Sequence, residues 1–109
     1  MAEKQAIRVG GAAGFWGDAD HATAQLLESG PLDFLVYDYL AEITLSIMAR
    51  ARAKDPSQGY ARDFPKTLAL HRRNLNARGL RVIANAGGVT PSACAAALRE
   101  EAQAQGVDL

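Results

Sequence analysis

Three short apolar segments alternate with longer segments of helical character, and this alternation constrains the fold more than any other feature of the sequence. Residues 6–10 and 80–84 are short and rich in β-branched residues, and residues 32–37 form a mostly unalternated apolar run. Such a run is typical of a strand covered on both faces of a parallel sheet. Helical segments between the strands supply the crossovers that parallel strands need. The sequence therefore predicts an α/β fold with an open parallel three-stranded sheet, flanking helices and a Rossmann-like βαβ order.

Capping residues and periodicity set the expected helices. Four are predicted, over residues 19–29, about 39–54, 64–78 and 91–105. Asp18 is the expected N-cap of the first helix and Thr90 that of the last, while Gly79 is expected to end the third. The second helix has an apolar stripe at helical spacing, formed by Leu40, Ile43, Thr44, Ile47, Met48 and Ala51.

The end of the sequence predicts an incomplete sheet. Gly106 is placed to cap the last helix, and residues 107–109 resemble the first residues of a fourth strand. Three short parallel strands leave two unprotected edges. We therefore expect residues 1–109 to be the N-terminal part of a single α/β domain, truncated at the start of a fourth strand. The remaining portion of that domain is then an expected partner.

Charge and composition exclude several classes of partner. The 109 residues include 12 basic and 12 acidic side chains, with no long block of either sign, so neither nucleic acid nor a membrane is an expected partner. No apolar stretch reaches the roughly 18 residues needed to cross a bilayer. A single cysteine, Cys94, and the lack of a signal-peptide pattern indicate a cytoplasmic protein. His21 and His71 lack metal-binding spacing, so no metal site is predicted.

Three loops follow the expected strands and should meet at the carboxyl edge of the sheet, where open α/β folds bind ligands. The candidate ligand-binding residues in these loops are Gly11, Gly14, Trp16, Asp18, Asn85, Gly87 and Gly88. Glycine lets backbone approach an anionic or carbonyl group, and the Asn85 amide can orient a carbonyl. Asp38 and Glu42, four residues apart, are the candidate catalytic groups for proton transfer.

Structural interpretations of the same residues stay open. Glycines after a strand often serve only as turns, and Asp18 fits a helix cap as well as a ligand contact. Asp38 and Glu42 also fit a solvated first turn that the helix dipole favours. Trp16 and its neighbour Phe15 should face opposite ways, with one of them entering the core.

An NAD(P)-dependent, short-chain-dehydrogenase-like domain is an alternative. Asn85-Ala-Gly-Gly88 is similar to the Asn-Ala-Gly segment of those enzymes, and Asp38 lies where a ribose-binding acid is wanted. The spacing of Gly11, Gly14 and Gly17 departs from the dinucleotide fingerprints, and no Tyr-x-x-x-Lys is present. These departures disfavour the dehydrogenase alternative.

Four separated patches of the sequence resemble the acyclic terpene utilisation family, the AtuA type. The matching residues are Gly14-Phe-Trp-Gly-Asp18; Gly30-Pro-Leu-Asp33 with Asp38-Tyr-Leu-Ala-Glu42; Ala53-Lys-Asp-Pro56 with Gly59-Tyr60; and Arg81-Val-Ile-Ala-Asn-Ala-Gly-Gly88. The sequence departs from the expected family pattern at residues 10–13, where we expect a polar residue in relatives. Because family members are several times longer, the resemblance implies that this chain is the beginning of their N-terminal domain.

The resemblance implies a role in bacterial breakdown of acyclic isoprenoids such as citronellol and geraniol, through branched unsaturated acyl-CoA intermediates. The leading hypothesis is thus a domain of an acyl-CoA-processing enzyme that acts on an isoprenoid carboxylate or acyl-CoA. No cofactor is indicated, and a CoA ester would enter as part of the substrate. A non-catalytic fragment of a truncated or split domain is the main alternative, and a homo-oligomer stays open.

Overall fold

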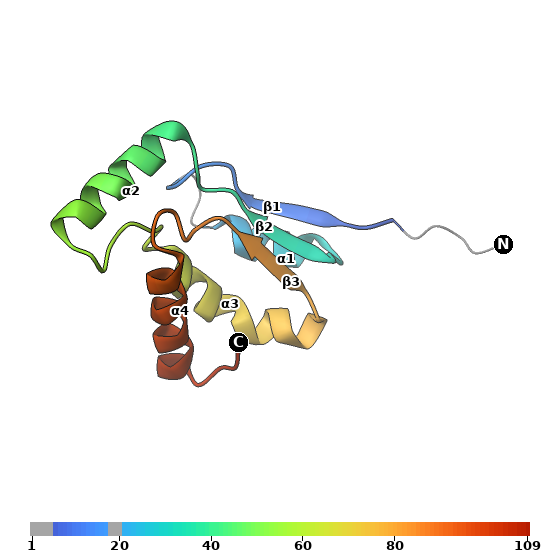
Figure 1. Ribbon diagram of the computed structural model, residues 1–109. Helices are drawn as coiled ribbons and strands as arrows, with labels where there is room; N and C mark the ends of the chain where they lie inside the picture. The colour runs from blue at the N-terminus through green and yellow to red at the C-terminus, as the bar shows by residue number, and fades with distance from the viewer. Residues whose placement is uncertain (1–5, 18–20) are drawn as a thin grey trace.

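The computed structural model describes residues 6–17 and 21–109 (Figure 1). Its elements are β1 (Val9–Ala13), α1 (Ala22–Ser29), β2 (Phe34–Tyr37), α2 (Glu42–Lys54), α3 (Phe64–Arg78), β3 (Arg81–Ala84) and α4 (Pro91–Gln105). The strands pair in parallel in the order β1-β2-β3. The predicted α/β fold with an open three-stranded parallel sheet is confirmed, and the strand order is consistent with a Rossmann-like arrangement.

One face of the sheet carries the core. On the central strand, Leu35 and Tyr37 are buried, whereas Phe34 and Val36 are only partly buried. The Tyr37 side chain contacts both Thr23 of α1 and Phe64 of α3, so these two helices cover the same face. On the opposite face, Val9 and Ile83 keep 59% and 56% of their surface exposed. The prediction that β2 is covered on both faces is therefore wrong for the residues that the structure describes.

The first strand begins and ends later than predicted. β1 continues through both of its glycines to Ala13 instead of stopping at Gly10. A Cβ at Gly10 would lie 2.9 Å from Leu32 Cδ1, so glycine lets the strand pass beneath this leucine. The first helix begins at Ala22 after His21, and the expected cap Asp18 lies outside the described residues.

The second helix ends at Lys54 as predicted, but its apolar stripe is only partly buried. Thr44 and Met48 are buried, while Ile43 and Ile47 remain 70% and 49% exposed. In Figure 1, α2 projects beyond the carboxyl ends of the strands, and α3 lies nearer the sheet. Helical spacing predicted the existence of α2 correctly, but α3 is the helix that lies beside the sheet.

The last two helices have the predicted bounds, and Gly79 and Gly106 end them in the left-handed conformation. Thr90 is not a side-chain cap, because its hydroxyl donates to the Gln58 carbonyl instead. Residues 107–109 form no strand in this structure. They turn back toward α3, where the Asn76 side chain donates to the Asp108 carbonyl over 2.9 Å.

Candidate functional site

The loops that follow the three strands meet at the carboxyl edge of the sheet, as the sequence predicted. The Asp38 amide donates to the Ala13 carbonyl at 3.1 Å, and the Asn85 amide donates to the Tyr37 carbonyl at 3.3 Å. The Trp16 amide donates to the Tyr39 carbonyl at 3.2 Å. These backbone bonds bring the three loops side by side, so side chains from all three can reach one ligand.

The side-chain amide of Asn85 joins the second and third loops. Its Nδ2 donates to Asp38 Oδ1 at 2.7 Å, and its Oδ1 accepts from the Tyr39 amide at 2.8 Å. These two contacts fix the amide orientation, because only the oxygen can accept from a backbone N–H. They also fix one carboxylate oxygen of Asp38, while both side chains remain solvent-exposed. The pair is thus an ordered polar group at the mouth of the loops.

Glu42 lies apart from this pair in the first turn of α2. Its side chain is exposed, and no described hydrogen bond links it to Asp38 or Asn85. The turn itself is fixed by Thr44, whose hydroxyl accepts from the Ala41 amide at 2.6 Å. The two candidate carboxylates therefore follow the same strand, but only Asp38 is held by a neighbouring loop.

Trp16 ties the first loop to the start of α3. Its indole Nε1 donates to Asp63 Oδ1 at 2.7 Å, and its ring packs against the core. Its neighbour Phe15 is 58% exposed, so the two aromatic side chains lie in different environments, as expected. Asp63 was not predicted as a site residue, since no local pattern links it to a tryptophan 47 positions away.

The candidate glycines fall into two groups. A Cβ at Gly88 would lie 2.5 Å from both the Gly59 carbonyl oxygen and Met48 Sδ, and a Cβ at Gly87 would lie 2.8 Å from Pro91 Cα. By contrast, a Cβ at Gly11 would meet nothing within 4 Å, and Gly14 is exposed in the first loop. The third loop therefore needs its glycines for close packing, whereas Gly11 leaves open space beside the backbone of β1.

A fourth segment, residues 58–61, supports the third loop. The Val89 amide donates to the Gly59 carbonyl at 2.9 Å, and the Ala61 amide donates to the Ala86 carbonyl at 2.8 Å. No role at the site was predicted for this segment, although Gly59 belongs to one of the patches that resemble the family. The positive φ of Gly59, 111°, explains why glycine stands there.

Burial shifts the pKa values of three side chains that are not part of this polar group. Desolvation raises the pKa of the Tyr37 hydroxyl, an effect partly offset by its hydrogen bond to Thr23. Burial also raises the pKa of the Cys94 thiol, which favours its interpretation as a small core residue over a nucleophile. Burial lowers the pKa of His71. Among the described residues, no three His, Cys, Asp or Glu side chains gather as a metal site would require.

An open parallel sheet whose loops meet at its carboxyl edge defines an α/β protein of the kind that binds ligands at the strand ends. A family model described as acyclic terpene utilisation family protein AtuA matches residues 7–109. The chain belongs to this family. A comparison with curated proteins found no match, and neither did a comparison with solved structures. In the described part of the chain, no helix has both the length and the apolar character needed to cross a membrane.

Proposed function

We propose that this chain acts in the breakdown of acyclic terpenes by binding an isoprenoid carboxylate or acyl-CoA at the carboxyl edge of its sheet. Family membership supports the terpene class of the ligand. The site itself is proposed from the ordered contact among Asp38, Asn85 and the Tyr39 amide. This contact is the observation that carries the proposal, because it joins two loops around a fixed carboxylate.

The contact suggests separate chemical roles for Asp38 and Asn85. Asn85 uses one N–H on Asp38, which leaves its second N–H to donate to a substrate carbonyl. Asp38 Oδ1 is held by that amide, so Oδ2 is the carboxylate oxygen that we assign to proton transfer. A donor on the carbonyl oxygen stabilises the negative charge that develops there when a neighbouring carbon loses a proton. Glu42 would be the second proton-transferring group.

The ligand class is tested by thermal unfolding of the chain with geranoyl-CoA, free geranic acid and unesterified CoA. A ligand at 100 times its Kd stabilises the folded state by about 2.7 kcal/mol, which raises the unfolding midpoint of a chain of this size by roughly 10 °C. We expect a rise with geranoyl-CoA or geranic acid, and a smaller rise when Asn85 is replaced by alanine. No rise with either compound at millimolar concentration would contradict the proposal. A rise with NADH alone would favour the dehydrogenase alternative.

A second candidate is a non-catalytic part of a domain that other residues complete. The exposed face of the sheet favours it, because Val9 and Ile83 leave a half-covered parallel sheet where such sheets usually carry helices on both faces. We expect the chain on its own to bind an apolar dye and to unfold with low cooperativity. Cooperative two-state unfolding of a monomer without dye binding would contradict this candidate.

A further inference from the structure

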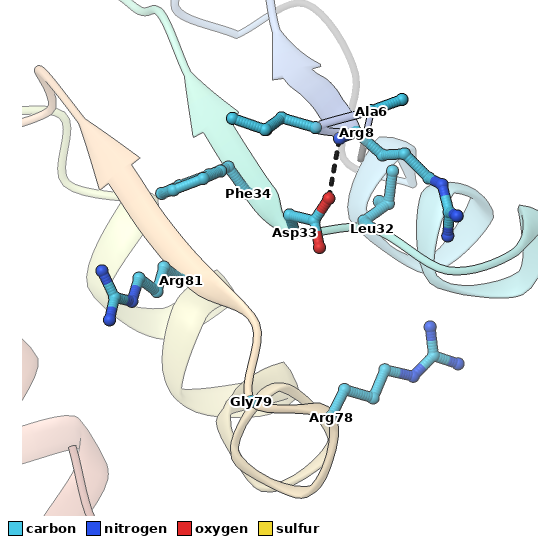
Figure 2. Close-up of a pocket in the computed structure, with 9 residues that line it drawn as sticks. Ala6, Arg8, Leu32, Asp33, Phe34, Arg78, Gly79 and Arg81 are labelled. Atoms are coloured by element: carbon cyan, nitrogen blue, oxygen red, sulfur yellow. Dashed lines mark hydrogen bonds between the residues drawn. The ribbon is translucent and has the colours of Figure 1, made fainter. Parts of the chain in front are cut away.

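A pocket of about 590 Å³ lies at the amino ends of the strands (Figure 2). The loops described above lie at the other end of the sheet, where the strands finish. Arg8, Arg78 and Arg81 line it together with the apolar side chains of Ile7, Leu32 and Phe34. Strands of four or five residues span roughly 13–17 Å, so this pocket is separate from the carboxyl edge. Its volume falls within the range of small-molecule sites, about 300–1,000 Å³.

The pocket carries an excess of positive charge in a chain whose formal net charge is zero. Its single acidic side chain, Asp33, accepts the Arg8 backbone amide at 2.8 Å and ties the segment before β1 to the loop before β2. None of the three guanidinium groups forms an ion pair within the described residues 6–17 and 21–109. The pocket therefore has three guanidinium groups and one carboxylate, and that carboxylate already accepts a hydrogen bond.

The C-terminus of α3 also lies at this pocket, and its carbonyl groups would repel an anion if they were unsatisfied. They are partly satisfied within the helix cap. The Gly79 amide donates to the Asn76 carbonyl at 3.1 Å, and the Leu80 amide donates to the Leu75 carbonyl at 3.0 Å. The arginines are therefore the dominant charges around the pocket.

The arginines do not all point the same way. Figure 2 shows the Arg8 and Arg78 side chains extending toward the same side, with Leu32 beside Arg8 in this view. The Arg81 side chain extends toward the other side of β3. Arg8 and Arg78 are thus placed to share one ligand, whereas Arg81 adds charge from a distance.

We propose that this pocket binds an organic phosphate, with its phosphoryl groups held by Arg8 and Arg78. The planar fork of a guanidinium group matches two phosphoryl oxygens, and two such forks on one side suit a group with more than one negative charge. Leu32, which lines the same pocket, supplies apolar surface for the organic part of the ligand. This inference is independent of the function proposed for the carboxyl edge.

The test is an isothermal titration of the chain at low ionic strength, with ADP as the probe and adenosine as its uncharged counterpart. We expect saturable ADP binding that weakens as salt is added, and adenosine binding that is at least about tenfold weaker. Arg8→Gln and Arg78→Gln should each weaken ADP binding by about three- to fivefold, and Arg81→Gln by less than about twofold. All three side chains are exposed, so these variants should retain the fold, which circular dichroism checks.

Two controls decide where ADP binds. Arg99→Gln removes an exposed arginine from α4, away from the pocket, and should leave the Kd unchanged. Asp38→Asn changes the carboxyl edge and should also leave the Kd unchanged. The proposal is overturned if ADP does not bind at millimolar concentration, if Arg99→Gln weakens binding as much as Arg78→Gln, or if binding depends on Asp38 and not on Arg78.

Discussion

The loop after β1 and the loop after β3 are both rich in glycine, but the glycines have different physical roles. In the loop after β3, a Cβ at Gly88 or Gly87 would collide with neighbouring segments. At Gly17 in the loop after β1, and at Gly11 within β1 itself, a Cβ would meet nothing within 4 Å, and Gly17 needs glycine only for its positive φ of 86°. The loop after β3 is closed by packing, whereas the backbone at Gly11 and Gly17 has free space beside it. Glycines of similar number therefore serve close packing in the loop after β3 and leave accessible backbone at Gly11 and Gly17.

The largest effect on stability should come from adding a Cβ at Gly88, the most closely packed of these glycines. We expect Gly88→Ala to destabilise the chain by about 3 kcal/mol, since alanine pays for a left-handed backbone and also overpacks against Gly59 and Met48. Gly17→Ala is the matched control, because it shares the positive φ without the collision and should cost about 1 kcal/mol. Urea unfolding of both variants measures the difference. Equal losses would remove the distinction between the two loops.

The second effect tests how the loop after β3 holds the loop after β2. Asn85→Ala removes the hydrogen bonds to Asp38 and to the Tyr39 amide, and we expect a loss of about 1.5 kcal/mol in unfolding free energy. Asn74→Ala, at an exposed position of α3, is the control and should be neutral or slightly stabilising. Urea unfolding provides the comparison. If the two variants behave alike, the Asn85 contact contributes nothing to the order of these loops.

A third, smaller effect concerns the loop after β1. Trp16→Phe keeps an aromatic ring but removes the indole donor to Asp63, and the expected cost is about 1 kcal/mol. A double-mutant cycle with Asp63→Ala isolates the contribution of the hydrogen bond itself. We expect a coupling energy of about 0.5 kcal/mol or more, because the donor and the acceptor are 2.7 Å apart. Strict additivity would show that the ring, and not its N–H, anchors the loop.

The smallest effect should have the opposite sign. Gly11→Ala places a methyl group in open space on a strand, so restriction of the unfolded chain should stabilise the protein by about 0.5 kcal/mol. If a ligand approaches the backbone at Gly11, as predicted from the sequence, the same methyl group should weaken the binding of that ligand in the thermal assay. Improved stability with unchanged ligand binding would remove Gly11 from the proposed site.

The sequence predicted most reliably the features that local chemistry determines. The bounds of α3 and α4 follow from a proline in the first turn and a glycine at the end, and both were confirmed. The end of β1 was predicted too early, because Gly10 serves packing against Leu32 and does not form a turn. The incomplete burial of Ile43 and Ile47 could not be predicted either, because spacing does not reveal which of two helices takes the place beside the sheet.

In the candidate site too, some features could be predicted from the sequence, whereas others depend on tertiary packing. The strand order of an α/β fold predicts that Asp38 and Asn85 lie at one edge of the sheet, and the structure places them there in direct contact. The pairing of Trp16 with Asp63 and the support from Gly59 depend on a long connection whose course has no local signature. The arginine pocket was missed because Arg8, Arg78 and Arg81 are separated in sequence and come together only at the amino ends of the strands.

The central place of β2 has a consequence for how the described sheet opens. β1 and β3 each pair with β2, so β2 is hydrogen-bonded along both sides and each outer strand along one. Leu35 and Tyr37 on β2 are also among the most deeply buried side chains. Amide hydrogens that face solvent on an outer strand can exchange through fraying, whereas those of β2 must wait for an adjoining strand to separate. The amides of β2 should therefore take up deuterium more slowly than those of β1 and β3.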